Sequence, residues 1–138
     1  TVPPPTMAIF DASNRDMCEV KRLKTNTPLQ ALVMMNDPAV LEASRVLAAT
    51  LLEEKSNAKE KISKAFRLIV CRKPAEKELE VLTNYFNKQL KTIEDQSADK
   101  MLAIGERPLN KRIDKKTLAA MMRVISTIYN LEETIMKS

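Results

Sequence analysis

Histidine is missing from the 138 residues of this chain, and only one residue is glycine. Without histidine the chain cannot form a Ser-His-Asp or Cys-His catalytic group, and it lacks the commonest protein ligand for metals. Tight β-hairpins need turn residues with positive φ, which glycine usually supplies. The scarcity of glycine therefore argues against sandwiches and barrels, and against the Gly-rich loops that bind phosphates.

Aromatic residues make up 4% of the chain, and no apolar run is long enough to cross a membrane. The net charge is +5, but acidic residues are interspersed with the basic ones. Few aromatics and mixed charges disfavour a nucleic-acid surface, although a charge of this size permits an anionic partner. The basic residues considered for such a surface are Lys21, Arg22, Lys24, Lys111, Arg112, Lys115 and Lys116.

The composition that remains, 44% apolar and 30% charged, is typical of a chain with a buried core. Apolar residues recur with the helical period in five segments, over residues 28–35, 38–55, 58–71, 75–96 and 115–130. The connections are short, which favours antiparallel neighbours. We predict an all-α fold, an irregular antiparallel bundle of about five helices in a single domain over residues 10–138. Shorter helical turns are expected at 97–104 and 131–137.

Residues 1–9 contain three consecutive prolines, which predict an extended lead-in or interdomain linker. The chain begins with Thr1 rather than Met, and we interpret it as a piece of a longer protein. Residues 7–24 show no sustained helical period, so an ordered loop is expected there. Because long loops in compact domains usually have a reason, this one is suspected of function or anchoring.

The residues around Thr27 contain the sequence signals of a helix N-terminus. Thr27 and Gln30 form a capping box, and Pro28 occupies the first helical position. Asp37 and Pro38 repeat the cap-and-proline pattern for the next helix. We expect the buried face of the first helix to consist of Leu29, Leu32 and Val33.

Polar residues are unusually dense over residues 10–38. The residues proposed as a functional or anchoring set are Asp11, Asn14, Arg15, Cys18, Arg22, Asn26, Thr27, Gln30, Asn36 and Asp37. An acid/base pair drawn from Asp11, Asp16 and Glu19 is one interpretation. Ion pairs and loop-anchoring hydrogen bonds are the interpretation that the spacing favours, since nothing in it fixes a catalytic geometry.

The two cysteines, Cys18 and Cys71, allow two interpretations. They form a disulfide, or they are separate thiols with Cys71 in the core at the end of an apolar helical face. Two cysteines without histidine make no recognisable metal site, so no metal is predicted. The eight methionines are expected mainly in the core, with an adaptable binding surface as the alternative.

Several blocks of the chain resemble a known family. Residues 10–38 contain F-D-x-x-x-R-x-x-C, then R-x-x-TNTPLQAL and NDP. Residues 66–79 are similar to F-R-x-x-x-x-R-x-P-x-x-x-E-L, and residues 129–137 resemble a closing N-L-D-E-F-x-x-K. These blocks resemble the C-terminal domain of large planctomycete and Bacteroidetes proteins associated with c-type cytochrome modules. The resemblance spans nearly the whole chain, and TNTPLQAL is its most specific block.

The resemblance implies an exported, periplasmic or extracellular, multidomain parent protein with a haem-binding region upstream. The haem attachment pattern C-x-x-C-H does not occur in this chain, so no cofactor is expected in this domain. The leading hypothesis is a non-catalytic accessory domain that contacts the preceding domains of the same polypeptide. The alternatives are part of a carboxylate-based enzyme acting on polysaccharide, and a helical module that binds anions or nucleic acid.

Overall fold

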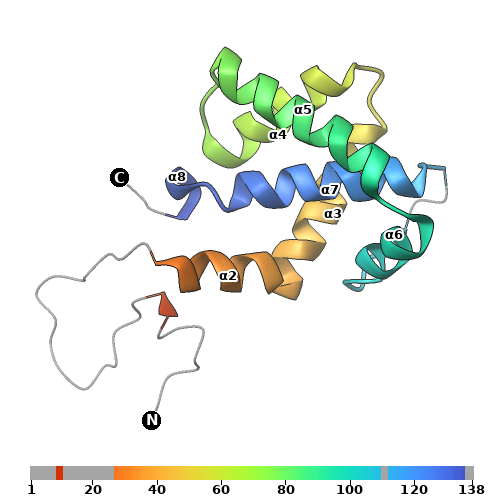
Figure 1. The fold of residues 1–138 in the computed structure, drawn as a ribbon, viewed down its shortest axis with the longest axis horizontal. Helices are drawn as coiled ribbons and strands as arrows, with labels where there is room; N and C mark the ends of the chain where they lie inside the picture. The colour runs from red at the N-terminus through yellow and green to blue at the C-terminus, as the bar shows by residue number, and fades with distance from the viewer. Residues whose placement is uncertain (1–8, 11–26, 110–111, 136–138) are drawn as a thin grey trace, which may run out of the picture.

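The computed structural model describes residues 9–10, 27–109 and 112–135. Within these residues the chain forms seven helices and no strand, so the all-α prediction is confirmed. The helices, shown in Figure 1, are α2 (Pro28–Asn36), α3 (Pro38–Leu52), α4 (Ala58–Val70), α5 (Glu76–Thr92), α6 (Asp95–Leu102), α7 (Lys115–Tyr129) and α8 (Glu132–Ile135). The seven include the predicted main helices, about five in number, and the shorter turns expected near 97–104 and 131–137 are the helices α6 and α8.

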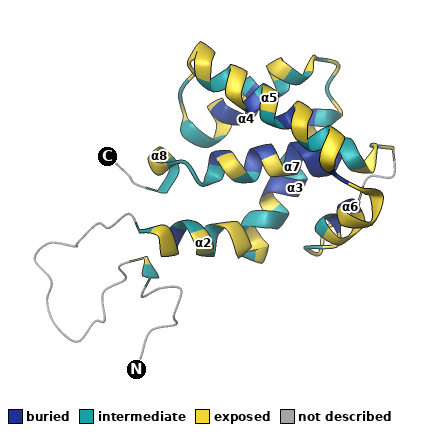
Figure 2. Cartoon of the chain, in the orientation of Figure 1, coloured by how far each residue is buried: buried dark blue, intermediate teal, exposed yellow. Residues whose placement is uncertain are grey.

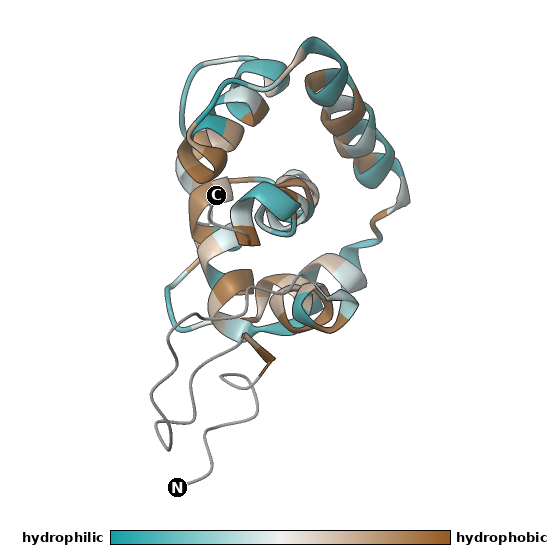
Figure 3. Cartoon of the chain, turned by 90° about the vertical axis from the view of Figure 1, so that its left-hand side faces the viewer, coloured by the Kyte–Doolittle hydropathy of each residue, from teal (hydrophilic) through white to brown (hydrophobic). Residues whose placement is uncertain are grey.

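Helix α7 is the centre of the bundle. It contacts α2, α3, α4, α5, α6 and α8, and α3 crosses it steeply in Figure 1. Seen end-on in Figure 3, it lies in the middle of a ring of the other helices. Its buried residues are Leu118, Ala119, Ala120, Met121, Met122, Val124, Ile125 and Ile128. A helix that is apolar on most sides must be covered on most sides, and this requirement sets the arrangement of its neighbours.

The helices begin at the residues whose side chains can cap them. Asp37 accepts hydrogen bonds from two amides in the first turn of α3, and Asn57 accepts one from the third residue of α4. Asp114 accepts from both the amide and the hydroxyl of Thr117 in α7, at 2.8 and 2.7 Å. These bonds satisfy amide groups that a helix start otherwise leaves without partners. The predicted starts of α3, α4 and α7 are therefore confirmed.

The predicted ends were less accurate. One helix was expected over residues 75–96, but α5 ends at Thr92 and α6 begins at Asp95. Ile93 lies between them in an extended conformation, and its side chain is buried. The extended backbone at Ile93 ends α5, and the separate helix α6 packs on α7. Helix α3 also ends earlier than predicted, at Leu52 rather than near residue 55.

Cys71 contradicts the prediction that it belongs to the core. It is exposed, and its thiol is free. The residue is the C-cap of α4 and has a left-handed backbone with φ of 62°. A left-handed residue leaves the helical path, so Cys71 no longer follows the buried face of α4. Cys18 lies outside the described residues.

The methionines of α7 distinguish between the two interpretations of the methionine residues, core packing and an adaptable binding surface. Met121 and Met122 are 0% and 3% exposed, which confirms the core interpretation for this pair. Met35 in α2 is 51% exposed and belongs to a surface described below.

Replacing Met121 with alanine should destabilise the fold. The side chain is fully buried in α7, so its loss leaves a cavity that costs about 2–5 kcal/mol. Thr127→Ala, an exposed position on the same helix, should stay within about 0.5 kcal/mol of the parent. Urea denaturation of the two variants measures the difference, and equal midpoints would contradict the central position of α7.

Candidate functional site

The structure describes four residues of the predicted functional set: Thr27, Gln30, Asn36 and Asp37. The other members, Asp11, Asn14, Arg15, Cys18, Arg22 and Asn26, lie outside the described residues, as do Asp16 and Glu19 of the acid/base interpretation. All four described members lie in or beside α2.

Gln30 is the one buried residue of α2, with 1% of its surface exposed. Its Oε1 accepts a hydrogen bond from the Thr27 amide at 3.0 Å, while its own amide donates to Thr27 Oγ1 at 3.3 Å. The predicted capping box is therefore present. The Gln30 side chain also donates from Nε2 to the Ile9 carbonyl at 2.9 Å. Gln30 thus ties residue 9 to the first turn of α2, a role that the capping pattern does not reveal.

Asn36 and Asp37 form the boundary between α2 and α3. Asn36 donates from Nδ2 to the Leu32 carbonyl at 2.8 Å, and Asp37 caps α3. The Asp37 amide also donates to the Val33 carbonyl at 2.8 Å, which closes the last turn of α2. Both residues therefore serve as helix boundary signals.

The apolar residues of α2 lie differently from the prediction. Leu29 and Leu32 were expected to face the core, but they are 52% and 56% exposed, and Val33 is only partly buried. Met35, three residues after Leu32, is 51% exposed. Residues spaced by three share one side of a helix. We call Leu29, Leu32 and Met35 the α2 apolar face; Figure 2 shows exposed positions along this helix.

The prediction failed because α2 is covered on only part of its surface. Helix α2 lies at the edge of the fold, where it contacts α3 and α7. The buried Gln30 side chain bonds the Thr27 amide at the start of the same helix and the Ile9 carbonyl, so these bonds do not join α2 to the other helices. Leu29 and Leu32 are left about half exposed. A periodic apolar pattern identifies a face, but it does not say what covers that face.

A pocket opens at the end of the α2 apolar face. Its volume is about 470 Å³, and residues of α2, α3, α5, α6 and α7 line it. Met35, Met101 and Met122 supply much of its apolar lining, and we call it the methionine pocket. Met35 belongs to both features, so the exposed face leads into the pocket. Methionine side chains are flexible and polarisable, and they adapt to apolar groups of various shapes.

The methionine pocket also has a polar end. Asn130 donates from Nδ2 to the Ser126 carbonyl at 2.9 Å, which fixes the orientation of its amide. The other amide atom, Asn130 Oδ1, is buried and has no partner among the described residues. Buried acceptors are nearly always satisfied, so this oxygen suits an N–H or O–H group of an occupant. Arg123 Nη2 lies 3.6 Å from Met101 Sδ at the same pocket.

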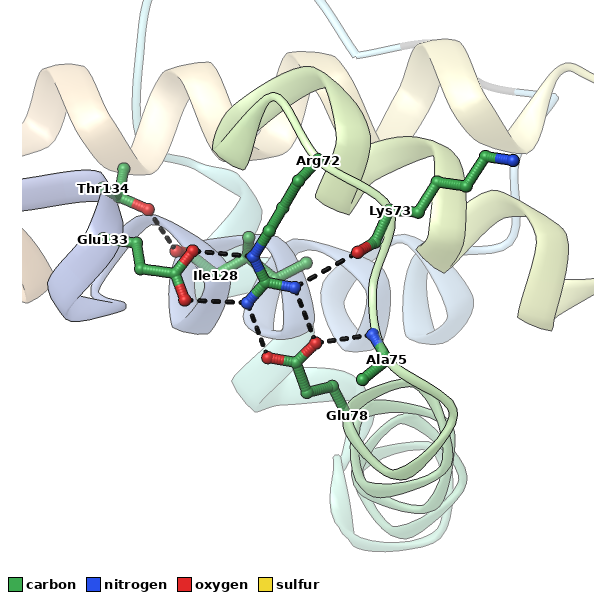
Figure 4. Close-up of polar contacts among 7 residues, drawn as sticks. All are labelled: Arg72, Lys73, Ala75, Glu78, Ile128, Glu133 and Thr134. Carbon is green, nitrogen blue, oxygen red and sulfur yellow. Dashed lines mark hydrogen bonds and ion pairs between the residues drawn. The ribbon is translucent and has the colours of Figure 1, made fainter.

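The largest charged cluster that the structure describes centres on Arg72, after α4. Its guanidinium bonds both oxygens of Glu78, at 2.7 and 2.9 Å, and both oxygens of Glu133, at 2.7 and 2.8 Å (Figure 4). It also lies over the Phe66 ring, 4.8 Å from the centroid. Planar two-point pairs are the favoured geometry for arginine and carboxylate. We call these residues the Arg72 brace, because Arg72 links α5 to α8 through Glu78 and through Glu133, which is 61 positions away from Arg72.

The Arg72 brace explains the titration of its carboxylates. Hydrogen bonds from Arg72, and then from the Ala75 amide, lower the pKa of Glu78 to about 2. Hydrogen bonds from Arg72 also lower the pKa of Glu133, and both partners raise the pKa of Arg72. A general acid at neutral pH needs a raised pKa, so these carboxylates are unsuited to that role. The brace is a structural element.

Other described carboxylates are also engaged. The pKa of Asp114 is lowered, chiefly by hydrogen bonds from Thr117, and the pKa of Glu42 is lowered, chiefly by the Arg107 amide. No group of three or more Cys, Asp or Glu residues able to hold a metal occurs in the part of the chain that the structure describes. Asp114 and Glu42, like Glu78 and Glu133, therefore favour their charged forms.

Two of the basic residues considered for nucleic acid are neutralised by acids of α6. Lys115 Nζ lies 2.6 Å from Asp99 Oδ1, and Lys116 Nζ lies 3.3 Å from Asp95 Oδ1. The Asp99 carboxylate raises the pKa of Lys115. These pairs place negative charge beside Lys115 and Lys116 at the start of α7. Lys21, Arg22, Lys24 and Lys111 lie outside the described residues.

The comparisons with known proteins identify the family but no activity. A family model described as PSD1, protein of unknown function (DUF1553), matches residues 1–86. This match covers more than half of the chain, and the protein belongs to that family. No curated protein and no solved structure matches the chain. Among the described residues, no helix has the length and apolar character that a membrane span requires.

The Arg72 brace predicts how stability depends on pH. The pKa of Glu78 is about 2 in the fold against a usual value of 4.5. A carboxyl group whose pKa is lower in the folded than in the unfolded chain stabilises the fold at every pH above its unfolded pKa. This stabilisation is therefore present at pH 7, and it is lost as the pH falls from 4.5 towards 2.

Glu78→Gln should therefore lower the melting temperature at pH 7, and its difference from the parent should shrink as the pH approaches 2. Glu80→Gln, an exposed position on the same helix, is the matched control and should change little. Thermal denaturation between pH 7 and pH 2 checks both variants. A difference between Glu78→Gln and the parent that does not depend on pH would contradict the assignment.

Proposed function

We propose that this chain is a non-catalytic interaction domain, and that the α2 apolar face and the methionine pocket are its docking surface. The observation that carries the proposal is the exposure of Leu29, Leu32 and Met35, each by about half, on one side of one helix. Clustered apolar side chains of this size on a surface mark contact sites, whereas single ones do not. The adjoining pocket receives an anchor side chain, and its methionines adapt to the shape of that anchor.

The occupant proposed is a preceding domain of the same polypeptide. The Gln30–Ile9 hydrogen bond supports this choice, because it holds the chain at residue 9 against α2. Residue 9 is therefore held at the same helix that carries the α2 apolar face. Phe10, which follows the residue bonded to Gln30, is itself 40% exposed and adds apolar surface at this point. A tether of this kind raises the effective concentration of the partner, so a modest surface is sufficient.

The resemblance noted above supplies the rest of the proposal. The parent would be an exported, periplasmic or extracellular protein associated with c-type cytochrome modules, and any haem would lie in its upstream part. The composition of this chain supports that division, since it contains neither histidine nor a C-x-x-C-H sequence. In this proposal the domain positions the parts that precede it and performs no reaction itself.

The test is to place charges on the α2 apolar face. A double variant, Leu29→Glu with Leu32→Glu, should keep its helicity and melting temperature because both side chains already contact water. Its binding to a separately produced upstream region should weaken by more than about tenfold, since charged residues disrupt the centre of an apolar contact. Isothermal titration calorimetry measures the affinity.

Val81→Glu is the matched control. Val81 is 66% exposed on α5, away from the α2 apolar face, so this variant should bind as the parent does. Undiminished binding by the double variant would refute the proposal. Equal loss in the double variant and in the control would also refute it, because the effect would then come from general charge.

A further inference from the structure

Arg45 is a buried arginine that the proposed docking surface does not use. It lies in α3, and 3% of its surface is exposed. Arginine is rarely this buried unless its charge and its N–H groups have partners. The surroundings of Arg45 supply such partners only in part.

Both described contacts of Arg45 involve one nitrogen. Nη2 donates to the Arg107 carbonyl at 2.7 Å and lies 3.5 Å from Glu42 Oε1. Nε is buried and has no hydrogen-bond partner among the described residues. A guanidinium carries five N–H donors, so most of this group's hydrogen-bonding capacity is not taken up by the described residues.

Glu42 neutralises Arg45 weakly because its carboxylate has other partners. Glu42 Oε1 accepts hydrogen bonds from the amides of Glu106 and Arg107, both at 2.8 Å. The turn that presents these amides begins at Gly105, whose φ is +93° and whose added Cβ would overlap the Glu42 side chain. Glycine is therefore needed both for the backbone and for the close approach. The turn holds the Arg107 carbonyl over Arg45, and the ion pair of Arg45 with Glu42 remains long.

Arg45 lines a cavity of about 340 Å³ between α3 and residues 107–109. Val46, Ala49, Pro108 and Leu109 give this cavity apolar walls. Glu53 lines it as well, eight residues after Arg45 on the same helix, which is about 12 Å along the axis. The cavity thus has a cationic end, apolar walls and an acidic end.

We propose that this cavity binds a short aliphatic monocarboxylate, with its carboxylate on the Arg45 guanidinium and its hydrocarbon part against Val46, Ala49 and Leu109. Arginine is suited to carboxylates because its donors lie in one plane and bond both oxygens. The apolar walls favour a hydrocarbon chain over an inorganic anion. A second carboxylate would lie against these apolar walls, so a monocarboxylate is favoured.

The ligand is small, so its affinity should be modest, with a dissociation constant on the order of 1 mM. The probe is 3-methylbutanoate, titrated into the isotopically labelled full chain and followed by NMR. We expect saturable shifts at the Arg45 side-chain Nε–H and at the amides of Val46 and Leu109. The neutral amide of the same acid, which matches it in shape, should give no saturable shift at equal concentration.

Two further probes distinguish the class of anion. Glutarate, which adds a second carboxylate, should bind more weakly than 3-methylbutanoate, because that group would lie against the apolar walls. Inorganic phosphate should bind more weakly than the aliphatic acid. Tighter binding of phosphate, or equal binding of the neutral amide, would overturn the proposal.

The decisive variant is Arg45→Met, which keeps the length of the side chain and removes the charge. It should weaken 3-methylbutanoate binding by roughly tenfold to a hundredfold, the loss expected for a hydrogen bond to a charged group. Arg67→Met, an exposed position on α4, is the matched control and should bind as the parent does. Unchanged binding by Arg45→Met would refute the site. If that variant fails to fold, the comparison of acid with amide on the parent chain still decides the question.

Discussion

The rest of the fold depends on covering α7. Eight of its fifteen residues are buried, and they lie on most sides of the helix. A helix of this kind cannot form part of a flat layer, because water would then reach one of its apolar sides. Helices α3, α4, α5 and α6 all contact α7. Each of them carries most of its charged residues outward, which accounts for the high proportion of charged residues in a chain with a substantial core.

The covering of α7 also determines which helix is left for binding. The helices from α3 to α6 bury residues such as Ala48, Phe66, Leu82 and Leu102 in the common core, whereas α2 buries only Gln30. Helix α2 joins α3 at Asp37, and its buried Gln30 side chain bonds Thr27 and Ile9 rather than residues of the core. Its leucines therefore contribute little to the core. A helix that buries a polar side chain and exposes apolar ones is suited to bind a partner.

Local signals made the helix starts predictable, since a cap is a relation between residues three positions apart. Thr27 with Gln30, and Asp114 with Thr117, could be recognised for that reason. The Arg72 brace could not, because Glu133 is 61 positions away and only the fold brings it near. Arg45 was missed for a related reason: among the apolar residues of α3 a lone arginine is expected to reach solvent. Its burial depends on the turn that Gly105 allows.

The described polar residues of this protein fall into two groups, those whose hydrogen bonds are made within the chain and those with buried polar atoms that have no partner. Thr27, Gln30 and Asp37 form helix starts, and Arg72 with Glu78 forms a brace, so their hydrogen bonds are made within the chain. The Arg72 brace also joins two blocks of the family resemblance, residues 66–79 and 129–137, and it accounts for their charged positions structurally. Arg45 Nε and Asn130 Oδ1 are different, since both are buried and neither has a partner among the described residues. Leaving such atoms unpaired costs stability, which an occupant would restore. The binding capacity of the described part of this chain is therefore to be sought at these two atoms and at the apolar face beside one of them.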